Sequence, residues 1–242
     1  MTLSKNAKTT LLAVLIPLAV TLAGHHHSSV KGLEAKTLDA RFKYARHGMK
    51  ASPEVVVLLI DEASLQSMHP LVGRWPWPRA LQGELVDFLA SAGAKGVLFD
   101  ILFTEPQVPR TAEGELGESD QALVVASASS GITHHAFQLL VDVEDEVNKH
   151  LINNPLPKLF VENFAVKDVE VRTKLPANNN YYIPFEEIYE NTAAMGVVEF
   201  SPDDDGVYRS THFLRPYQGA FFPVLPLSGW LKAKPPGKIV WD

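Results

Sequence analysis

The 242-residue sequence contains no cysteine, which excludes a disulfide framework and metal sites built on thiolates. It also lacks an excess of positive charge, because 22 Lys and Arg against 28 Asp and Glu give a net charge of -6. This balance argues against nonspecific binding of nucleic acid, which needs a basic surface. Glycine-rich phosphate loops, the G-x-S-x-G motif and the H-E-x-x-H motif are missing too, so nothing supports the corresponding nucleotide-binding, hydrolase and zinc-protease classes.

Only one long apolar run is present, and it predicts a membrane or export segment. Lys5 and Lys8 precede residues 11–24, which are almost wholly apolar. Basic residues before such a run orient its N-terminus toward the cytoplasm, so the rest of the chain is expected outside. The run is shorter than the ~20 residues of a usual spanning helix, which leaves a cleaved signal peptide open beside an uncleaved anchor. We favour the anchor, with residues 1–24 in the inner (cell) membrane and 25–242 as an extracytoplasmic domain.

The stretch after this run is polar and then helical. His25, His26 and His27 are expected to form a solvated patch, because no partner nearby would complete a metal site. Apolar residues at helical spacing predict a helix over 33–46 that leaves the membrane and docks on the domain. Ser52-Pro53 follows as a break, since the residue before a proline avoids the helical conformation.

Two apolar runs predict parallel strands joined by a helix. Residues 55–60 and 97–103 are almost free of polar alternation, which is typical of strands covered on both faces. The helix between them has an apolar stripe, expected to pack on the sheet, formed by Leu81, Leu85, Phe88, Leu89 and Ala92. Asp61 follows the first run, and Asp100 follows Val97-Leu98-Phe99 within the second. Parallel strands place their carboxyl ends side by side. The pattern therefore predicts a βαβ unit with two carboxylates on one edge.

The remaining patterns complete an α/β fold. A helix is predicted over 120–129, capped by Asp120 and ended by Gly131, before a strand over 132–141. Residues 195–200 and 207–214 flank Asp205-Gly206, and the glycine can supply the positive φ of a tight hairpin turn. We therefore expect a mixed sheet with a parallel βαβ core flanked by helices, plus an antiparallel C-terminal hairpin. Shorter helices are expected at about 143–152, 184–192 and within 221–231.

Acidic side chains are expected to gather at the carboxyl edge of this sheet. They are Asp61, Glu62, Asp100, Glu105 and Asp120. Like charges this close are costly unless a cation offsets them. Arg79 is the first candidate, and Mg²⁺ or Ca²⁺, which prefer oxygen ligands, is the second. The alternative is that Asp61 and Asp100 cap nearby amides and pair with Arg79 simply to hold the fold.

Two further features bear on ligand binding. Trp75 and Trp77 alternate with prolines, which makes a stiff platform that could stack a ring or a cation, or else cover the rim of the sheet. The loop over 104–119 is rich in glycine, proline and glutamate, so we expect it to be mobile. His134 and His135 adjoin in a predicted strand and point to opposite faces, one packed and one exposed. They cannot easily share a metal.

The order of these signals resembles the type-two CHASE domain, a cyclase- and histidine-kinase-associated sensory extracellular domain. The resemblance rests on fragments spread over about 33–231: Ile60-Asp61-Glu62 with Ser64; Trp75-Pro76-Trp77-Pro78-Arg79; Gly93-Ala94-Lys95-Gly96; Phe99-Asp100-Ile101-Leu102-Phe103 with Glu105-Pro106; Asp120 with Ala122 and Leu123; Gly196-Val197-Val198; and Asp203-Asp204-Asp205-Gly206-Val207-Tyr208-Arg209. Each fragment is weak alone, and their order is what makes the resemblance specific.

The resemblance implies a bacterial membrane receptor whose exported sensor domain, itself not an enzyme, controls an intracellular adenylate or guanylate cyclase or a kinase. It also implies a homodimer and an unidentified small-molecule or ionic signal. The family pattern continues with further membrane helices and an output module, which this sequence does not contain, so we expect a fragment of a longer receptor. Two other hypotheses stay open: an exported metal-dependent enzyme using the acidic edge, and a dimerisation module without a ligand.

Overall fold

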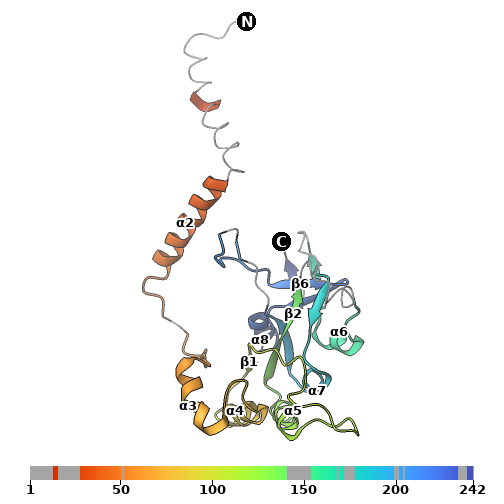
Figure 1. Ribbon diagram of the computed structural model, residues 1–242. Helices are drawn as coiled ribbons and strands as arrows, with labels where there is room; N and C mark the ends of the chain where they lie inside the picture. Colours follow the sequence, from red (N-terminus) through yellow and green to blue (C-terminus); the bar gives the residue numbers. More distant parts are fainter. Residues whose placement is uncertain are drawn as a thin grey trace, which may run out of the picture. The chain divides into compact units, whose positions relative to one another are not determined.

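The computed structural model describes residues 13–15, 28–50, 52–140, 154–167, 169–171, 178–198, 202–203, 205–233 and 239–241. The chain divides into an N-terminal unit, residues 1–59, and a second unit, residues 60–242 (Figure 1). The predicted apolar segment 11–24 lies outside the described residues except for 13–15, which are helical. The histidines at 25–27 and the predicted helix at 143–152 also lie outside them.

The N-terminal unit contains the predicted membrane-proximal helix. Helix α2, Ser28–Ala45, begins five residues before the predicted start at 33 and ends one residue before the predicted end. Residues 55–59, expected as the first part of a strand, belong to none of the helices and strands of this structure. Val56 is 78% exposed, whereas a strand of a parallel sheet would be covered on both faces. The prediction of a strand over 55–60 is therefore wrong for this structure.

The second unit is built on a mixed sheet whose centre is β2, Thr133–Leu140 (Figure 1). Parallel neighbours are β1, Val97–Phe99, with Leu98 opposite His134, and β5, Ala194–Val197, with Met195 opposite His135. The far half of β2 pairs antiparallel with β4, Asn180–Tyr182. Helix α5, Glu118–Ser130, connects β1 to β2, so the parallel βαβ core is confirmed one element further along the chain than predicted.

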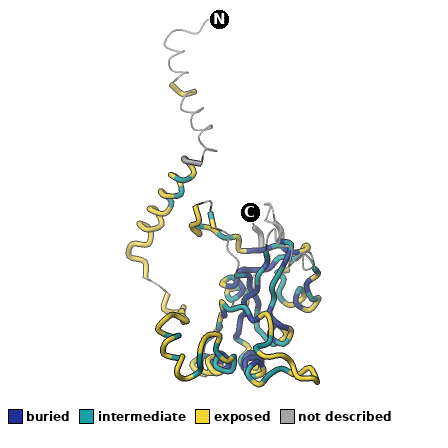
Figure 2. Tube along the Cα trace, in the orientation of Figure 1, coloured by how far each residue is buried: buried dark blue, intermediate teal, exposed yellow. Residues whose placement is uncertain are grey.

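Helices cover both faces of this sheet. Helix α4, Arg79–Ser91, lies along α5, and together with β1 they form one apolar core that includes Val86, Phe99 and Leu123. Helix α8, Leu225–Ala233, packs on the other face against β1, β2 and β5. Gly196 is required at this contact, because a Cβ there would lie 2.3 Å from the Cα of Leu225. Figure 2 shows the burial concentrated in this sheet.

The buried face of α4 is not the apolar stripe that the sequence predicts. The helix buries Gln82, Gly83 and Val86, whereas Leu85 and Phe88 are exposed. Gly83 explains why this face of α4 is the buried one, because a Cβ there would lie 3.0 Å from the backbone oxygen of Ala122 in α5. Helix α4 therefore approaches α5 closely through the face that carries Gly83. The predicted apolar stripe of α4 is partly exposed to solvent.

The antiparallel C-terminal hairpin is confirmed, although its turn differs from the predicted one. Strand β6, Leu214–Tyr217, pairs with β7, Ala220–Pro223, across Gln218 and Gly219, both of which have positive φ. Gly206 does take a positive φ of 79° in a tight turn, and its N–H donates to the Asp203 carbonyl. The segment after that turn forms no strand before Leu214, so this turn does not join the hairpin strands.

The other described elements are short. They are α3, Glu62–Val72; α6, Lys158–Phe164; α7, Glu186–Glu190; and the parallel pair β3, Val169–Val171, and β8, Ile239–Trp241. Helix α3 has Asp61 as its N-cap, whose side chain accepts a hydrogen bond from the backbone N–H of Ser64. Helix α5 ends at a left-handed Gly131, as predicted. It begins after Gly117 and not at Asp120, so Asp120 lies inside its first turn and does not cap it.

Candidate functional site

Arg79, the first residue of α4, lies in a pocket of protein groups that satisfy its charge. Its Nη1 is 2.5 Å from Oδ1 of Asp120, and its Nη2 donates to the Glu105 backbone carbonyl at 2.6 Å. The guanidinium carbon also lies 5.1 Å and 5.3 Å from the ring centres of Phe103 and Phe185. Asp120 is wholly buried and the Arg79 side chain is 11% exposed, so this ion pair lies in the interior.

Gln107 completes the arrangement by joining three segments of backbone. Its N–H donates to Oδ2 of Asp120 at 2.9 Å, and its Oε1 accepts from the backbone N–H of Arg79 at 3.0 Å. Its Nε2 donates to the Trp77 carbonyl, and the Ser119 hydroxyl donates to its Oε1. We call Arg79, Glu105, Gln107 and Asp120 the Arg79–Asp120 cluster. The Arg79 guanidinium, the Asp120 carboxylate and the Gln107 amide are matched within the protein, and this favours a structural role.

The sequence predicted that Arg79, Asp120 and Glu105 lie close together, and the structure confirms this. Glu105, however, contributes its backbone carbonyl and not its carboxylate. Gln107 and Ser119 were missed, because no local pattern marks a residue whose partners are 12 to 30 positions away.

Asp61 and Asp100 do not join this cluster through any described contact. Oδ1 of Asp61 accepts hydrogen bonds of 2.8 Å from the backbone N–H and the hydroxyl of Ser64. These bonds to Ser64 lower the pKa of the Asp61 carboxyl. Asp100 follows β1 at the surface. The prediction that both end neighbouring strands is wrong for Asp61, because it starts a helix and no strand precedes it.

Divalent cation binding was one purpose considered for these acidic residues. Among the described residues, no three or more His, Asp or Glu side chains gather where they could hold a metal ion. Asp61 and Asp120 already accept hydrogen bonds from protein groups. The part of the chain that the structure describes therefore offers no ligand set that suggests Mg²⁺ or Ca²⁺.

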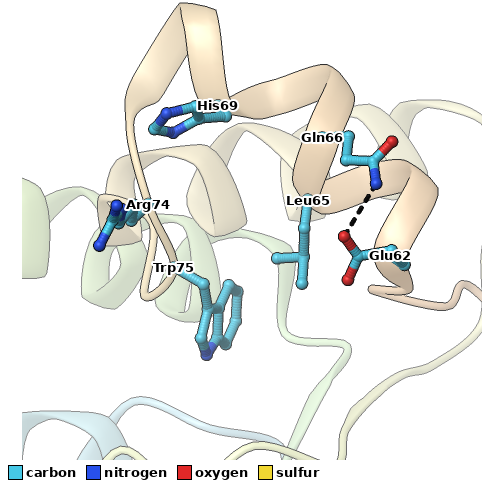
Figure 3. Close-up of a pocket in the computed structure, with 6 residues that line it drawn as sticks. All are labelled: Glu62, Leu65, Gln66, His69, Arg74 and Trp75. Carbon is cyan, nitrogen blue, oxygen red and sulfur yellow. Dashed lines mark hydrogen bonds between the residues drawn. The ribbon is translucent and has the colours of Figure 1, made fainter.

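A second group of candidates lines an open groove at α3. The α3 groove has a volume of about 370 Å³ and is lined by Glu62, Leu65, Gln66, His69, Arg74 and Trp75 (Figure 3). Leu65 is half-buried, and the other five lining residues are exposed. Gln66 donates to Glu62 at 2.9 Å, and Trp75 packs edge-on against Trp77 with ring centres 5.4 Å apart.

The groove combines groups that can recognise a small molecule. Trp75 offers an aromatic face, Arg74 a cation and Glu62 an anion, and all three are exposed. No described residue forms an ion pair with Arg74. The volume falls within the usual range of ligand pockets, about 300–1,000 Å³. The chemistry suits a small zwitterion or an anion that carries an apolar or aromatic group.

The loop over 104–119, expected to be mobile, is tied to the fold at two points. Arg110 forms a two-point ion pair with Glu187 of α7, with distances of 2.7 Å and 2.8 Å. The hydrogen bonds from Arg110 lower the pKa of Glu187, and the same bonds raise the pKa of Arg110. Gln107 fixes the beginning of the loop in the Arg79–Asp120 cluster. These contacts do not support the expectation of a free loop.

His134 and His135 point to opposite faces of β2, as predicted, but both are buried. His135 stacks on Phe99 with ring centres 5.0 Å apart, and its Nε2 is 3.5 Å from the Ser127 hydroxyl. Burial lowers the pKa of His135 to about 3. Burial and, secondarily, the Lys232 charge lower the pKa of His134 to about 4. Both histidines are therefore neutral packing residues near pH 7, and the expectation of an exposed histidine is wrong.

The fold and these sites define a mixed α/β domain with a surface groove. Comparison with known families confirms the resemblance to the type-two CHASE domain. The chain matches the CHASE2 domain family over residues 10–239, nearly its whole length, and therefore belongs to that family. CHASE2 domains are extracytoplasmic sensor domains and are not catalytic. No curated protein and no solved structure matches the chain.

Membrane attachment was predicted from the N-terminal apolar run. None of the helices that the structure describes is long and apolar enough to cross a bilayer. That finding covers only three residues of the run itself, because 11–12 and 16–24 are not among the described residues.

Proposed function

We propose that this chain is the extracytoplasmic sensory region of a bacterial transmembrane receptor. It detects an environmental signal and passes it to an intracellular output module, an adenylate or guanylate cyclase or a protein kinase. The match to the CHASE2 family over residues 10–239 carries this proposal. The pattern of Lys5 and Lys8 before an apolar run supports it, because that pattern anchors a chain with its N-terminus in the cytoplasm.

Among the described residues, the α3 groove offers exposed groups that can receive the signal. Of the eight residues predicted to bind a ligand, Glu62 and Trp75 line this groove, whereas Arg79 and Asp120 engage each other. A ligand biases a receptor only by its difference in affinity between two conformations. Helix α3 has no buried residues, so its position can respond to an added contact at low cost.

Reporter fusions test the export of the domain. The full chain is joined at Asp242 to alkaline phosphatase, which is active only outside the cytoplasm, or to a fluorescent protein that matures only inside. Active phosphatase and a dark fluorescent fusion are expected. The opposite pattern would place the domain in the cytoplasm and contradict the receptor topology. Deletion of residues 1–24 is the control, and it should abolish phosphatase activity.

A ligand screen on the purified full chain tests the groove. Small zwitterions and aromatic carboxylates are screened for a rise in melting temperature, and each hit is repeated with Trp75→Ala and with Val125→Ala, a matched change on α5. We expect hits to stabilise the parent chain and the α5 control but not the groove variant. Equal stabilisation of all three chains would place the ligand elsewhere and leave the family assignment untouched.

The rival hypothesis, an exported metal-dependent enzyme, makes a different prediction. It requires tight binding of Mg²⁺ or Ca²⁺ that falls with Asp100→Asn, together with turnover of a substrate. Calorimetric titration of the full chain with either cation separates the two hypotheses. The sensor hypothesis does not require such binding.

A further inference from the structure

The α3 groove is lined by one continuous stretch of the chain, residues 62–75. The lining residues that belong to α3 follow helical spacing along one face: Glu62, Leu65, Gln66 and His69. Gly73 ends this helix with a positive φ of 85°, and the next two residues complete the lining. The shape of the groove therefore depends on local backbone geometry and not on the packing of distant segments.

The two opposite charges of the groove lie at its two ends. Figure 3 shows Arg74 and His69 toward one end and Glu62 at the other. The side chains of Trp75 and Leu65 lie between these ends. Glu62 and His69 are two helical turns apart, about 10 Å along the axis of α3. The groove thus holds an anion and a cation apart across an apolar floor.

Both charges are available to a ligand. Among the described residues, neither Glu62 nor Arg74 has an ion-pair partner, so they do not pair with each other either. The Gln66 amide donates to Oε1 of Glu62, which fixes the position of the carboxylate without neutralising it. Trp77 packs edge-on against Trp75 and supports the indole that forms the floor.

This separation of charges restricts which zwitterions can use the whole groove. An α-amino acid has its ammonium and its carboxylate on one carbon, so it reaches only one end at a time. A ligand whose two charged groups are separated by an apolar chain reaches both ends and lays that chain on Trp75 and Leu65. Arg74 can hold the carboxylate through two parallel hydrogen bonds, and Glu62 can accept from the ammonium.

We propose that the α3 groove binds a zwitterion whose ammonium and carboxylate are separated by an apolar spacer. A linear ω-amino acid has this chemistry, and so does a dipeptide with an apolar side chain, because its two charged termini flank a peptide unit. The carboxylate binds at Arg74 and the ammonium at Glu62. The inference rests on the proposed role of the groove in receiving the signal, and it names the class of ligand.

A pair of isomers tests the spacing of the charges. 6-Aminohexanoate and leucine contain the same atoms and the same two charged groups, and only the separation of those groups differs. Each is titrated into the purified full chain in a calorimeter. We expect 6-aminohexanoate to bind with a dissociation constant of about 1 mM or lower, and leucine to bind at least about tenfold more weakly. Glycyl-leucine in the same titration distinguishes the sources: it should bind more tightly than 6-aminohexanoate if the groove receives peptides, and more weakly if it receives free ω-amino acids.

A charge reversal at one end should change the ligand that is selected. Glu62→Lys makes both ends of the groove cationic, so it should weaken the binding of 6-aminohexanoate about tenfold or more. The same variant should gain binding of hexanedioate, which has the same chain length and a carboxylate at each end. Glu84→Lys, an equal change at an exposed residue of α4, is the matched control and should leave both affinities unchanged.

Three results would overturn the inference: equal affinities for the two isomers, no binding of 6-aminohexanoate to the parent chain, or a Glu62→Lys variant that keeps the preference of the parent. None of them would contradict the receptor topology, because the phosphatase and fluorescent fusions report export independently. A phosphatase fusion that is inactive beside selective binding of 6-aminohexanoate would contradict the receptor and leave the ligand class standing.

Discussion

The Arg79–Asp120 cluster and the α3 groove contain the same kinds of side chain in opposite environments. Each has an arginine, a carboxylate, a glutamine and aromatic rings, and the two lie only a few residues apart in sequence at Arg74 and Arg79. In the cluster, the charges of Arg79 and Asp120 face each other, and Asp120 is wholly buried. In the groove, Arg74, Glu62 and Trp75 face solvent.

The difference shows how burial decides the role of a charged residue. A buried ion pair is costly to break, because removing one partner leaves an uncompensated charge in a medium of low polarity. Exposed charges interact weakly with each other and remain available to a ligand. The cluster is therefore expected to control stability, and the groove to control recognition. Four predictions test this division.

Asp120→Asn should have the largest effect on stability. The side chain keeps its size but loses the charge that faces Arg79, and breaking a buried pair in this way costs about 3–5 kcal/mol. For a domain of this size the melting temperature should fall by roughly 10 °C. Thermal unfolding of the full chain followed by circular dichroism measures it. Glu62→Gln, the equivalent change in the groove, is the control and should leave the melting temperature almost unchanged.

His135→Leu should reduce the dependence of folding stability on pH. The unfolded chain binds a proton near pH 6.5, whereas burial holds the pKa of His135 at about 3, so the stability of the folded state falls as pH drops from 6.5 toward 3. One such histidine accounts for about 2 kcal/mol between pH 7 and pH 5. Urea unfolding at both pH values should show a smaller loss in the variant. His69→Leu, an exposed change in the groove, is the control; a loss in His135→Leu as large as that of the parent would contradict the role given to His135.

Arg110→Met should have a small effect, because its ion pair with Glu187 is about one-third exposed. Exposed pairs contribute less than about 1 kcal/mol, and salt weakens them further. We expect a fall of at most a few degrees in the melting temperature that disappears in 1 M NaCl. A fall as large as that of Asp120→Asn would mean that the loop contact, and not the buried cluster, holds this region together.

Arg74→Gln should have the smallest effect on stability, within about 0.5 kcal/mol of the parent, as is usual for surface changes. No described residue pairs with its guanidinium, so the folded domain loses no ion pair. Binding of any anionic ligand identified in the groove should nevertheless weaken, measured by calorimetry. A strong loss of stability without a ligand would show that Arg74 is structural, like Arg79.

Local sequence signals predicted much of this fold. They predicted the residues of the Arg79–Asp120 cluster less completely. The helices that end at Gly131 and start after Pro78 follow from backbone preferences, and the strand 133–140 follows from its composition. The buried face of α4 could not be predicted, because the close approach of Gly83 to α5 overrides the larger apolar stripe. The strand expected at 55–60 depends on a neighbour, and sequence pattern alone does not say where that neighbour lies.

The sequence by itself determined the family, the α/β class and the absence of disulfides, because ordered motifs, periodicity and composition are properties of the chain. Only the tertiary structure decided that Arg79 faces Asp120, 41 positions away, while Asp61 caps the helix that carries Glu62. Which carboxylate meets an arginine depends on long-range packing, and packing energies are shared among many residues that no short motif contains.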